Sequence, residues 1–175
     1  MKHRFAVLLL TFSAALLCCG GCGYRIGTMG HPQIRTIAIA PVKNDTTVYN
    51  LSWILRNVLV EQFMLDGTLK AVDEKKADCI LYARIVSSTV RVVSEKHKYD
   101  RRRGDFEPDE WKISVSVEYS VIIPGQKKPL IPLRKVTGSA NYQSPGDVDA
   151  ARRRAAGQAC RDAAVEIVEF TTEAW

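Results

Sequence analysis

The chain has 175 residues, a length that fits one domain with a real hydrophobic core. Its formal net charge of +6 is mildly basic, which suits an anionic partner or surface but is too small to indicate nucleic acid. Three of the five cysteines lie within the first 22 residues, so the N-terminal segment has to be interpreted first.

Residues 1–21 have the pattern of a secretory signal. Two basic residues precede an apolar run from Phe5 to Leu17, which is shorter than the roughly 20 residues that span a bilayer. Two glycines then come directly before Cys22. We therefore expect a lipoprotein signal that is cleaved before Cys22, with a lipid anchor on that cysteine. A plain secretory signal without the lipid is the alternative.

Cleavage at this point leaves 154 of the 175 residues and lowers the net charge from +6 to +4, because Lys2 and Arg4 are removed. An exported protein does not normally meet nucleic acid, so we expect no nucleic-acid partner. Residues 22–33 are rich in glycine and polar residues and predict a tether. A single domain is expected from 34 to 175.

The first half of this domain predicts a strand, a helix and a long strand. Residues 34–42 are a β-branched run, and residues 51–66 carry apolar side chains at helical spacing. Asn50 is the expected N-cap of the helix, and Gly67 suits a left-handed residue at its end. Residues 78–94 are β-rich, and the more mixed second half of this run is expected to project past the core.

The second half predicts two more strands and a helix. Residues 95–110 form a charged connection. Residues 111–123 predict a strand in which apolar and polar side chains alternate strictly as far as Val121, and residues 131–142 resume strand character. Ser144 is the expected cap of a last helix that runs to about Phe170. Its apolar stripe, from Val148 to Phe170, is rich in alanine and should let the helix pack closely.

The element order is therefore β-α-β-β-β-α. It predicts an α+β fold in which two helices pack on one face of a four-stranded, mainly antiparallel sheet. The opposite face of the sheet should carry serine, threonine, lysine and glutamate. Cys79 and Cys160 fall in apolar segments, where isolated cysteines are usually buried small hydrophobes. A disulfide between them is the alternative, because the exported compartment is oxidising.

No pattern indicates catalysis or a cofactor. The sequence has no Gly-x-Ser-x-Gly element, and the three cysteines that remain after cleavage form no Cys-x-x-Cys pair. The histidines after the signal, His31 and His97, lie far apart. We therefore expect a protein that is not an enzyme and holds neither a metal nor another cofactor.

Basic residues cluster at the start of the charged connection. They suit either a solvated hairpin tip balanced by acidic neighbours or a contact with an anion such as phosphate. Three consecutive arginines, 152–154, are interpreted as a wet helix face. The candidate anion-binding residues are Lys96, Lys98, Arg101, Arg102 and Arg103.

Three short segments carry a family resemblance. They are Cys22-Gly23-Tyr24-Arg25, then Ile37-Ala38-Ile39-Ala40-Pro41-Val42-Lys43-Asn44 with Tyr49, and then the helix positions Leu51, Leu55, Leu59 and Phe63. In these segments and in its overall layout the chain resembles the lipopolysaccharide-assembly lipoprotein family, LptE.

The resemblance implies a lipoprotein that is anchored in the outer membrane through Cys22 and faces the periplasm. It implies two partners, a β-barrel translocon (LptD) that the protein plugs and the lipopolysaccharide that the barrel inserts. The alternative is an oligomeric secretion-associated lipoprotein of the curli-export type, which also begins with an anchor cysteine and a similar first strand.

Overall fold

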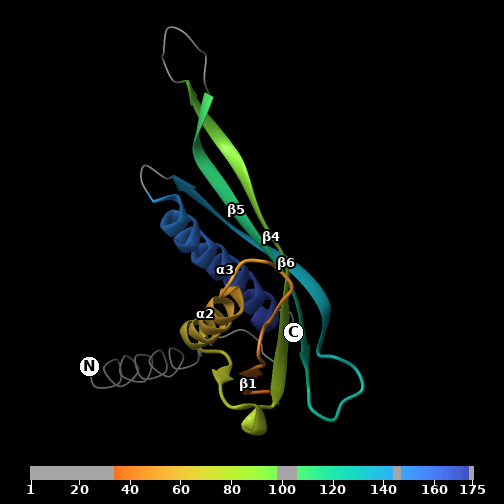
Figure 1. Cartoon of the computed structure of the whole chain (residues 1–175). Coiled ribbons are helices and arrows are strands. Elements are labelled where there is room, and N and C mark those ends of the chain that lie inside the picture. The colour runs from red at the N-terminus through yellow and green to blue at the C-terminus, as the bar shows by residue number, and fades with distance from the viewer. Residues whose placement is uncertain (1–33, 98–105, 144–146, 174–175) are drawn as a thin grey trace, which may run out of the picture.

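The computed structural model describes residues 34–97, 106–143 and 147–173, with the backbone alone at 96–97 and 106–108. Two helices lie on one side of a twisted sheet, which confirms the expected α+β class (Figure 1). In chain order the elements are β1 (Thr36–Ile39), β2 (Lys43–Asn44), α2 (Leu51–Asp66), β3 (Lys70–Ala71), the short 3-10 helix η2 (Glu74–Lys76), β4 (Cys79–His97), β5 (Phe106–Ile122), β6 (Ile131–Gln143) and α3 (Val148–Glu173).

The sheet has six strands rather than four. Its order is β3-β1-β4-β5-β6, and β2 pairs with β4 beyond the end of β1. The long pairings β4–β5 and β5–β6 are antiparallel, as expected, whereas β1, β2 and β3 pair in parallel. The two additional strands, β2 and β3, have two residues each. A two-residue strand has no periodicity that a sequence pattern could reveal.

The alternation along β5 separates a dry face of the sheet from a wet one. Val115, Val117 and Tyr119 are fully buried beneath the helices. On the opposite face the hydroxyls of Ser116 and Thr137 lie 2.9 Å apart and share a hydrogen bond. Farther along that face, Arg84 donates to Glu118 at 2.7 Å. The outer face is therefore polar along this stretch, as expected. Nearer to β1 the same face carries a small apolar cluster of Ala38, Ala40 and Ile80 with Ile122.

Strands β4 and β5 continue as a hairpin well past the helices (Figure 1). Their pairing runs out to His97 and Phe106, so the expected projection of the second half of β4 is confirmed. The expectation that all of residues 95–110 form a connection is wrong. Strand pairing is made by the backbone, and it carries on through charged positions such as Lys96, which lies opposite Glu107.

The ends of α2 match the prediction at one terminus only. Gly67 is left-handed (φ 72°), and its N–H donates to the Phe63 carbonyl, as expected. Asn50 precedes the helix, but its side chain makes no capping hydrogen bond. A capping side chain needs an extended backbone at that position, whereas Asn50 is left-handed with φ 66°.

Helix α3 has a capping side chain at Asp147. Ser144, the expected cap, lies outside the described residues. The Asp147 carboxylate accepts hydrogen bonds from the N–H groups of Asp149 and Ala150, both at 3.0 Å. These bonds, that of Ala150 above all, hold the pKa of Asp147 below its usual value. At the far end the helix continues to Glu173, beyond the expected Phe170.

The alanine face of α3 packs directly on the sheet. Ala155, Ala159 and Ala163 are buried, whereas Val148 and Phe170, the two ends of the expected stripe, are 47% and 42% exposed. The Arg134 guanidinium covers the Phe170 ring at 5.2 Å instead. Beneath the helix, a Cβ atom on Gly138 of β6 would lie 2.8 Å from the Ala163 Cβ and closer still to backbone atoms of Ala159 and Ala163.

Cys79 and Cys160 are both buried and both free, so the disulfide does not form and the packing interpretation is confirmed. Burial raises the pKa of each thiol to about 12. The two side chains behave as small hydrophobes of the core.

The close packing at Gly138 gives the first prediction. Gly138→Ala should lower the free energy of unfolding by at least about 2 kcal/mol, because the added methyl group meets rigid backbone rather than a side chain that can move. Urea unfolding followed by circular dichroism measures the change.

Gly157→Ala is the matched control. Gly157 lies within α3, and a Cβ added there has no heavy atom within 4 Å. This substitution should raise stability by about 0.5–1 kcal/mol, because alanine favours the helix over glycine. Equal effects of the two substitutions would show that α3 does not press on β6.

Candidate functional site

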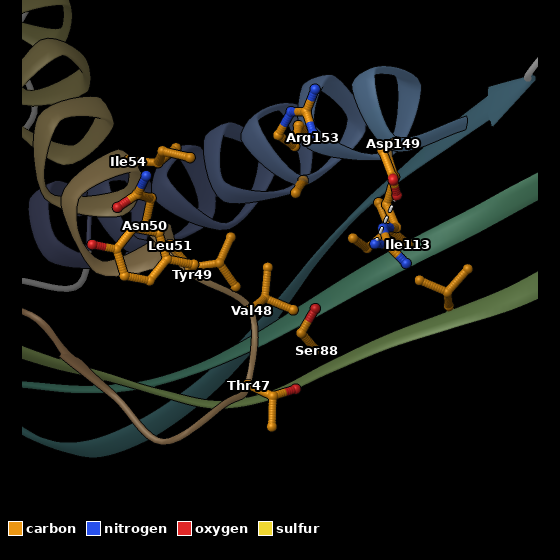
Figure 2. Close-up of a pocket in the computed structure, with 13 residues that line it drawn as sticks. Thr47, Val48, Tyr49, Asn50, Leu51, Ile54, Ser88, Ile113, Asp149 and Arg153 are labelled. Atoms are coloured by element: carbon orange, nitrogen blue, oxygen red, sulfur yellow. Dashed lines mark hydrogen bonds and ion pairs between the residues drawn. The ribbon is translucent and has the colours of Figure 1, made fainter. Parts of the chain in front are cut away.

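A cleft of about 530 Å³ opens at the base of the projecting hairpin. Its floor is the helix-facing side of β4 and β5, one wall is the start of α3, and the other wall is residues 47–51 with Ile54 of α2 (Figure 2). This volume lies in the range of sites for one small ligand.

The floor of the cleft is apolar. Ile113 of β5 and Ala156 of α3 are buried at its bottom. Val90 of β4 lies opposite Ile113 in the sheet and is 43% exposed. A bulge between Ile85 and Ser87 changes which β4 side chains face the helices, and it brings Ser88 and Val90 to the floor.

Asn44 organises the loop wall. Its amide nitrogen donates to the Val48 carbonyl at 2.9 Å, and its amide oxygen accepts from the backbone N–H and the hydroxyl of Thr46 at 3.0 and 2.7 Å. The Asp45 N–H is held by the Ile85 carbonyl of β4 at 3.0 Å. These bonds fix the loop, so that Val48 projects toward the sheet at the mouth of the cleft (Figure 2).

The helix wall supplies charge. Asp149 and Arg152 form an ion pair of 3.0 Å one turn into α3. Arg153 also lines the cleft and is exposed, and it makes no ion pair with any carboxylate that the structure describes. Arg153 does interact at longer range with the Asp147 carboxylate, whose pKa it helps to lower. The lining of the cleft therefore combines an apolar floor with two arginines and one aspartate at its rim, which suits a ligand that has an apolar chain and an anionic group.

Catalytic and metal chemistry find little support in these residues. The cleft is lined by the hydroxyls of Thr47, Tyr49 and Ser88, and its described lining includes no histidine or cysteine. Across the described residues no group of three His, Cys, Asp or Glu side chains is arranged to hold a metal. Nor does any helix in the same residues have both the length and the apolarity needed to cross a bilayer.

The structure describes only some of the residues singled out from the sequence. Cys22 and the tip residues Lys98, Arg101, Arg102 and Arg103 fall outside the described residues, and Lys96 is placed only by its backbone, at the end of β4. Arg152 and Arg153 were expected on a wet helix face. They are exposed, but the structure also places them on the wall of the cleft.

Sequence reasoning missed the cleft itself. One feature of the sequence could have indicated it. In the projecting half of β4, Val90 and Val92 place apolar side chains at alternate positions, where a strand exposed to solvent on both faces would carry polar ones. Asn44 was quoted for the family resemblance, but its role in shaping the loop needed the folded chain.

Comparison with known proteins gives a family and a fold. The family model for LptE, described as lipopolysaccharide-assembly, matches residues 34–170. No curated protein matches the chain. Among solved structures, the chain is similar to a protein from Xanthomonas campestris (15% identity, 82% of this chain, 89% of the other, TM-score 0.53).

Two further solved structures share the fold. A minor lipoprotein from Acinetobacter baumannii has 12% identity over 79% of this chain and 93% of its own, with a TM-score of 0.50. A homologue of a neuraminyllactose-binding haemagglutinin from Helicobacter pylori has 11% identity over 85% of this chain and 88% of its own, with a TM-score of 0.51. At these identities the likeness concerns the fold alone.

The hydrogen bonds of Asn44 give the second prediction. Asn44→Ala should lower the free energy of unfolding by about 1–2 kcal/mol, because it removes three hydrogen bonds of a half-buried amide. Amide hydrogen exchange at Thr46 and Val48 should become faster, which shows that the wall of the cleft has loosened.

Asn57→Ala is the control for this substitution. Asn57 lies on the exposed side of α2, so its replacement should change stability by less than about 0.5 kcal/mol and leave exchange in the loop unaltered. Unchanged exchange at Thr46 and Val48 in Asn44→Ala would mean that the loop holds its shape by other contacts.

Proposed function

The chain belongs to the LptE family of lipopolysaccharide-assembly proteins, and on this premise we propose that it is an outer-membrane lipoprotein that partners a β-barrel translocon and assists the insertion of lipopolysaccharide. The observation that carries the proposal is the extent of the family match, which covers residues 34–170. The match includes all six strands of the sheet, the whole of α2, and α3 except for its last three residues.

The proposed anchor is a fatty-acylated Cys22, exposed after removal of residues 1–21. The basic start, the short apolar run and the two glycines before the cysteine support this assignment. In this arrangement residues 22–33 tether the domain to the inner leaflet of the outer membrane, and the domain faces the periplasm.

The surface of the domain suits a polar surrounding such as the lumen of a wide barrel. A lumen of this kind is water-filled unless something occupies it. The outer face of the sheet presents hydroxyls and ion pairs, including Arg84 with Glu118 and Asp45. This polar part of the face can lie against a polar lumen, and the apolar cluster of Ala38, Ala40 and Ile80 near β1 is already buried in the domain.

We place the first contact with lipopolysaccharide at the basic residues near the hairpin tip. Lipopolysaccharide carries phosphates, which lysine and arginine side chains bind through charge-assisted hydrogen bonds. Several cations close together would compete with the divalent ions that link neighbouring lipopolysaccharide molecules. The proposed contact residues are Lys96, Lys98, Arg101, Arg102 and Arg103.

Purification of the lipidated protein from membranes tests the function. We expect it to bring along one large β-barrel protein in a one-to-one complex, together with lipopolysaccharide. Cys22→Ala, which removes the anchor, should release the protein from the membrane fraction. A ring-shaped oligomer of the chain without a barrel would overturn the proposal and favour a secretion-associated lipoprotein of the curli-export type.

Charge reversal tests the tip. Replacing Lys96, Arg101, Arg102 and Arg103 together with Glu should weaken lipopolysaccharide binding in a pull-down by at least about tenfold, because four favourable phosphate contacts become repulsive. The matched control reverses four exposed lysines remote from the hairpin, Lys43, Lys70, Lys75 and Lys76. Binding that falls equally in both variants would reflect net charge alone and would remove the tip from the mechanism.

A further inference from the structure

The projecting hairpin has an apolar strip on the side that faces the helices. Val90 and Val92 of β4 lie on this side and are 43% and 44% exposed. Their partners across the sheet are Ile113 and Trp111, so the apolar character continues onto β5. The alternate β4 residues, Thr89 and Arg91, are polar and lie on the opposite face. This part of β4 therefore has one apolar face and one polar face, although no helix covers the apolar one.

An aromatic pair borders this strip. Trp111 of β5 stacks on Tyr142 of β6 with ring centroids 5.7 Å apart. Register pairs Val92 with Trp111 and Trp111 with Tyr142, so the three side chains form one row across the sheet. Apolar surface therefore runs from this row past Val90 to the buried floor of the cleft at Ile113.

The lining of the cleft has one more cation than anion. Asp149 pairs with Arg152 at 3.0 Å, whereas Arg153 makes no direct ion pair with a described carboxylate and interacts with Asp147 only at longer range. An anionic group on a ligand could therefore accept hydrogen bonds from the Arg153 guanidinium without breaking an ion pair. The volume of about 530 Å³ suits one chain of a ligand rather than a whole multi-chain lipid.

We propose that the cleft and the valine strip bind one acyl chain of a phosphorylated glycolipid, with its phosphate on Arg153. The proposal rests on the proposed function, in which lipopolysaccharide is the phosphorylated glycolipid that the protein handles. The protein then holds an acyl chain away from water while the rest of the molecule stays outside. An apolar peptide segment of a partner could also occupy such a surface, and the experiment separates the two.

Photo-crosslinking in cells that make the full lipidated protein tests the proposal. A benzophenone amino acid replaces Val90 in one variant and Thr89 in another, so the two probes sit at neighbouring positions on opposite faces of β4. After irradiation, the probe at Val90 should yield an adduct that reacts with antibody against lipopolysaccharide, whereas the probe at Thr89 should not.

A charge reversal at the rim provides the second measurement. In the Val90 probe strain, Arg153→Glu should reduce the lipopolysaccharide adduct by about fivefold, the loss expected for one exposed charge-assisted contact. Arg91→Glu is the matched control, because it makes the same change at an exposed position on the outer face of β4 and should leave the adduct unaltered. Retention of the barrel partner by both variants shows that the fold is intact.

Three outcomes would overturn the inference. They are no adduct at Val90, an adduct with protein or phospholipid but without lipopolysaccharide, and an adduct that Arg153→Glu leaves unchanged. The proposed function fails by a different result, namely purified protein that brings along neither a barrel nor lipopolysaccharide. A protein that retains both yet gives no adduct at Val90 would keep its function and lose only the acyl-chain site.

Discussion

Helix α3 lies against strand β6 with backbone next to backbone, and this close approach at Gly138 sets the position of the whole helical layer. Small side chains make the approach possible, since Ala159 and Ala163 face a glycine. Helix α2 packs in turn against α3, and an ion pair of 3.3 Å between Arg161 and Glu61 links their outer sides. A wider spacing would lift both helices and open the core beneath them.

The contact between α3 and β6 also provides a hydrogen-bond partner at the edge of the sheet. Strand β6 is the last in the order, so some of its N–H groups face away from any neighbouring strand. One of them, at Ser139, donates to the Asp162 carboxylate of α3 at 2.9 Å. At this position the edge is less able to pair with another chain, which matters for a protein whose proposed partner is itself built of strands.

Because α3 is fixed on β5 and β6, the far half of the β4–β5 hairpin has no helix over it. This leaves an apolar side of two strands in contact with solvent, and the cleft forms where that side meets the first turns of α3 and the loop that Asn44 holds. The proposed roles follow this division. Basic residues of the tip meet phosphates, the cleft receives an acyl chain, and the polar outer face of the sheet meets the partner.

The sequence by itself determined the α+β class, helix α2 and the two faces of β5, because each follows from the spacing of apolar residues along a short segment. It also determined the end of α2, because Gly67 can adopt the left-handed backbone that ends a helix. Only the tertiary structure decided β2 and β3, the bulge after Ile85 and the cleft, because each depends on pairing or packing between segments far apart in the chain. The cap at Asp147 is a local interaction with residues 149 and 150, and the sequence pattern did not single it out. Arg153 illustrates the limit: its charge and exposure could be read from a helix pattern, but its place on the same cleft as Val90 is set by the way α3 packs on the sheet.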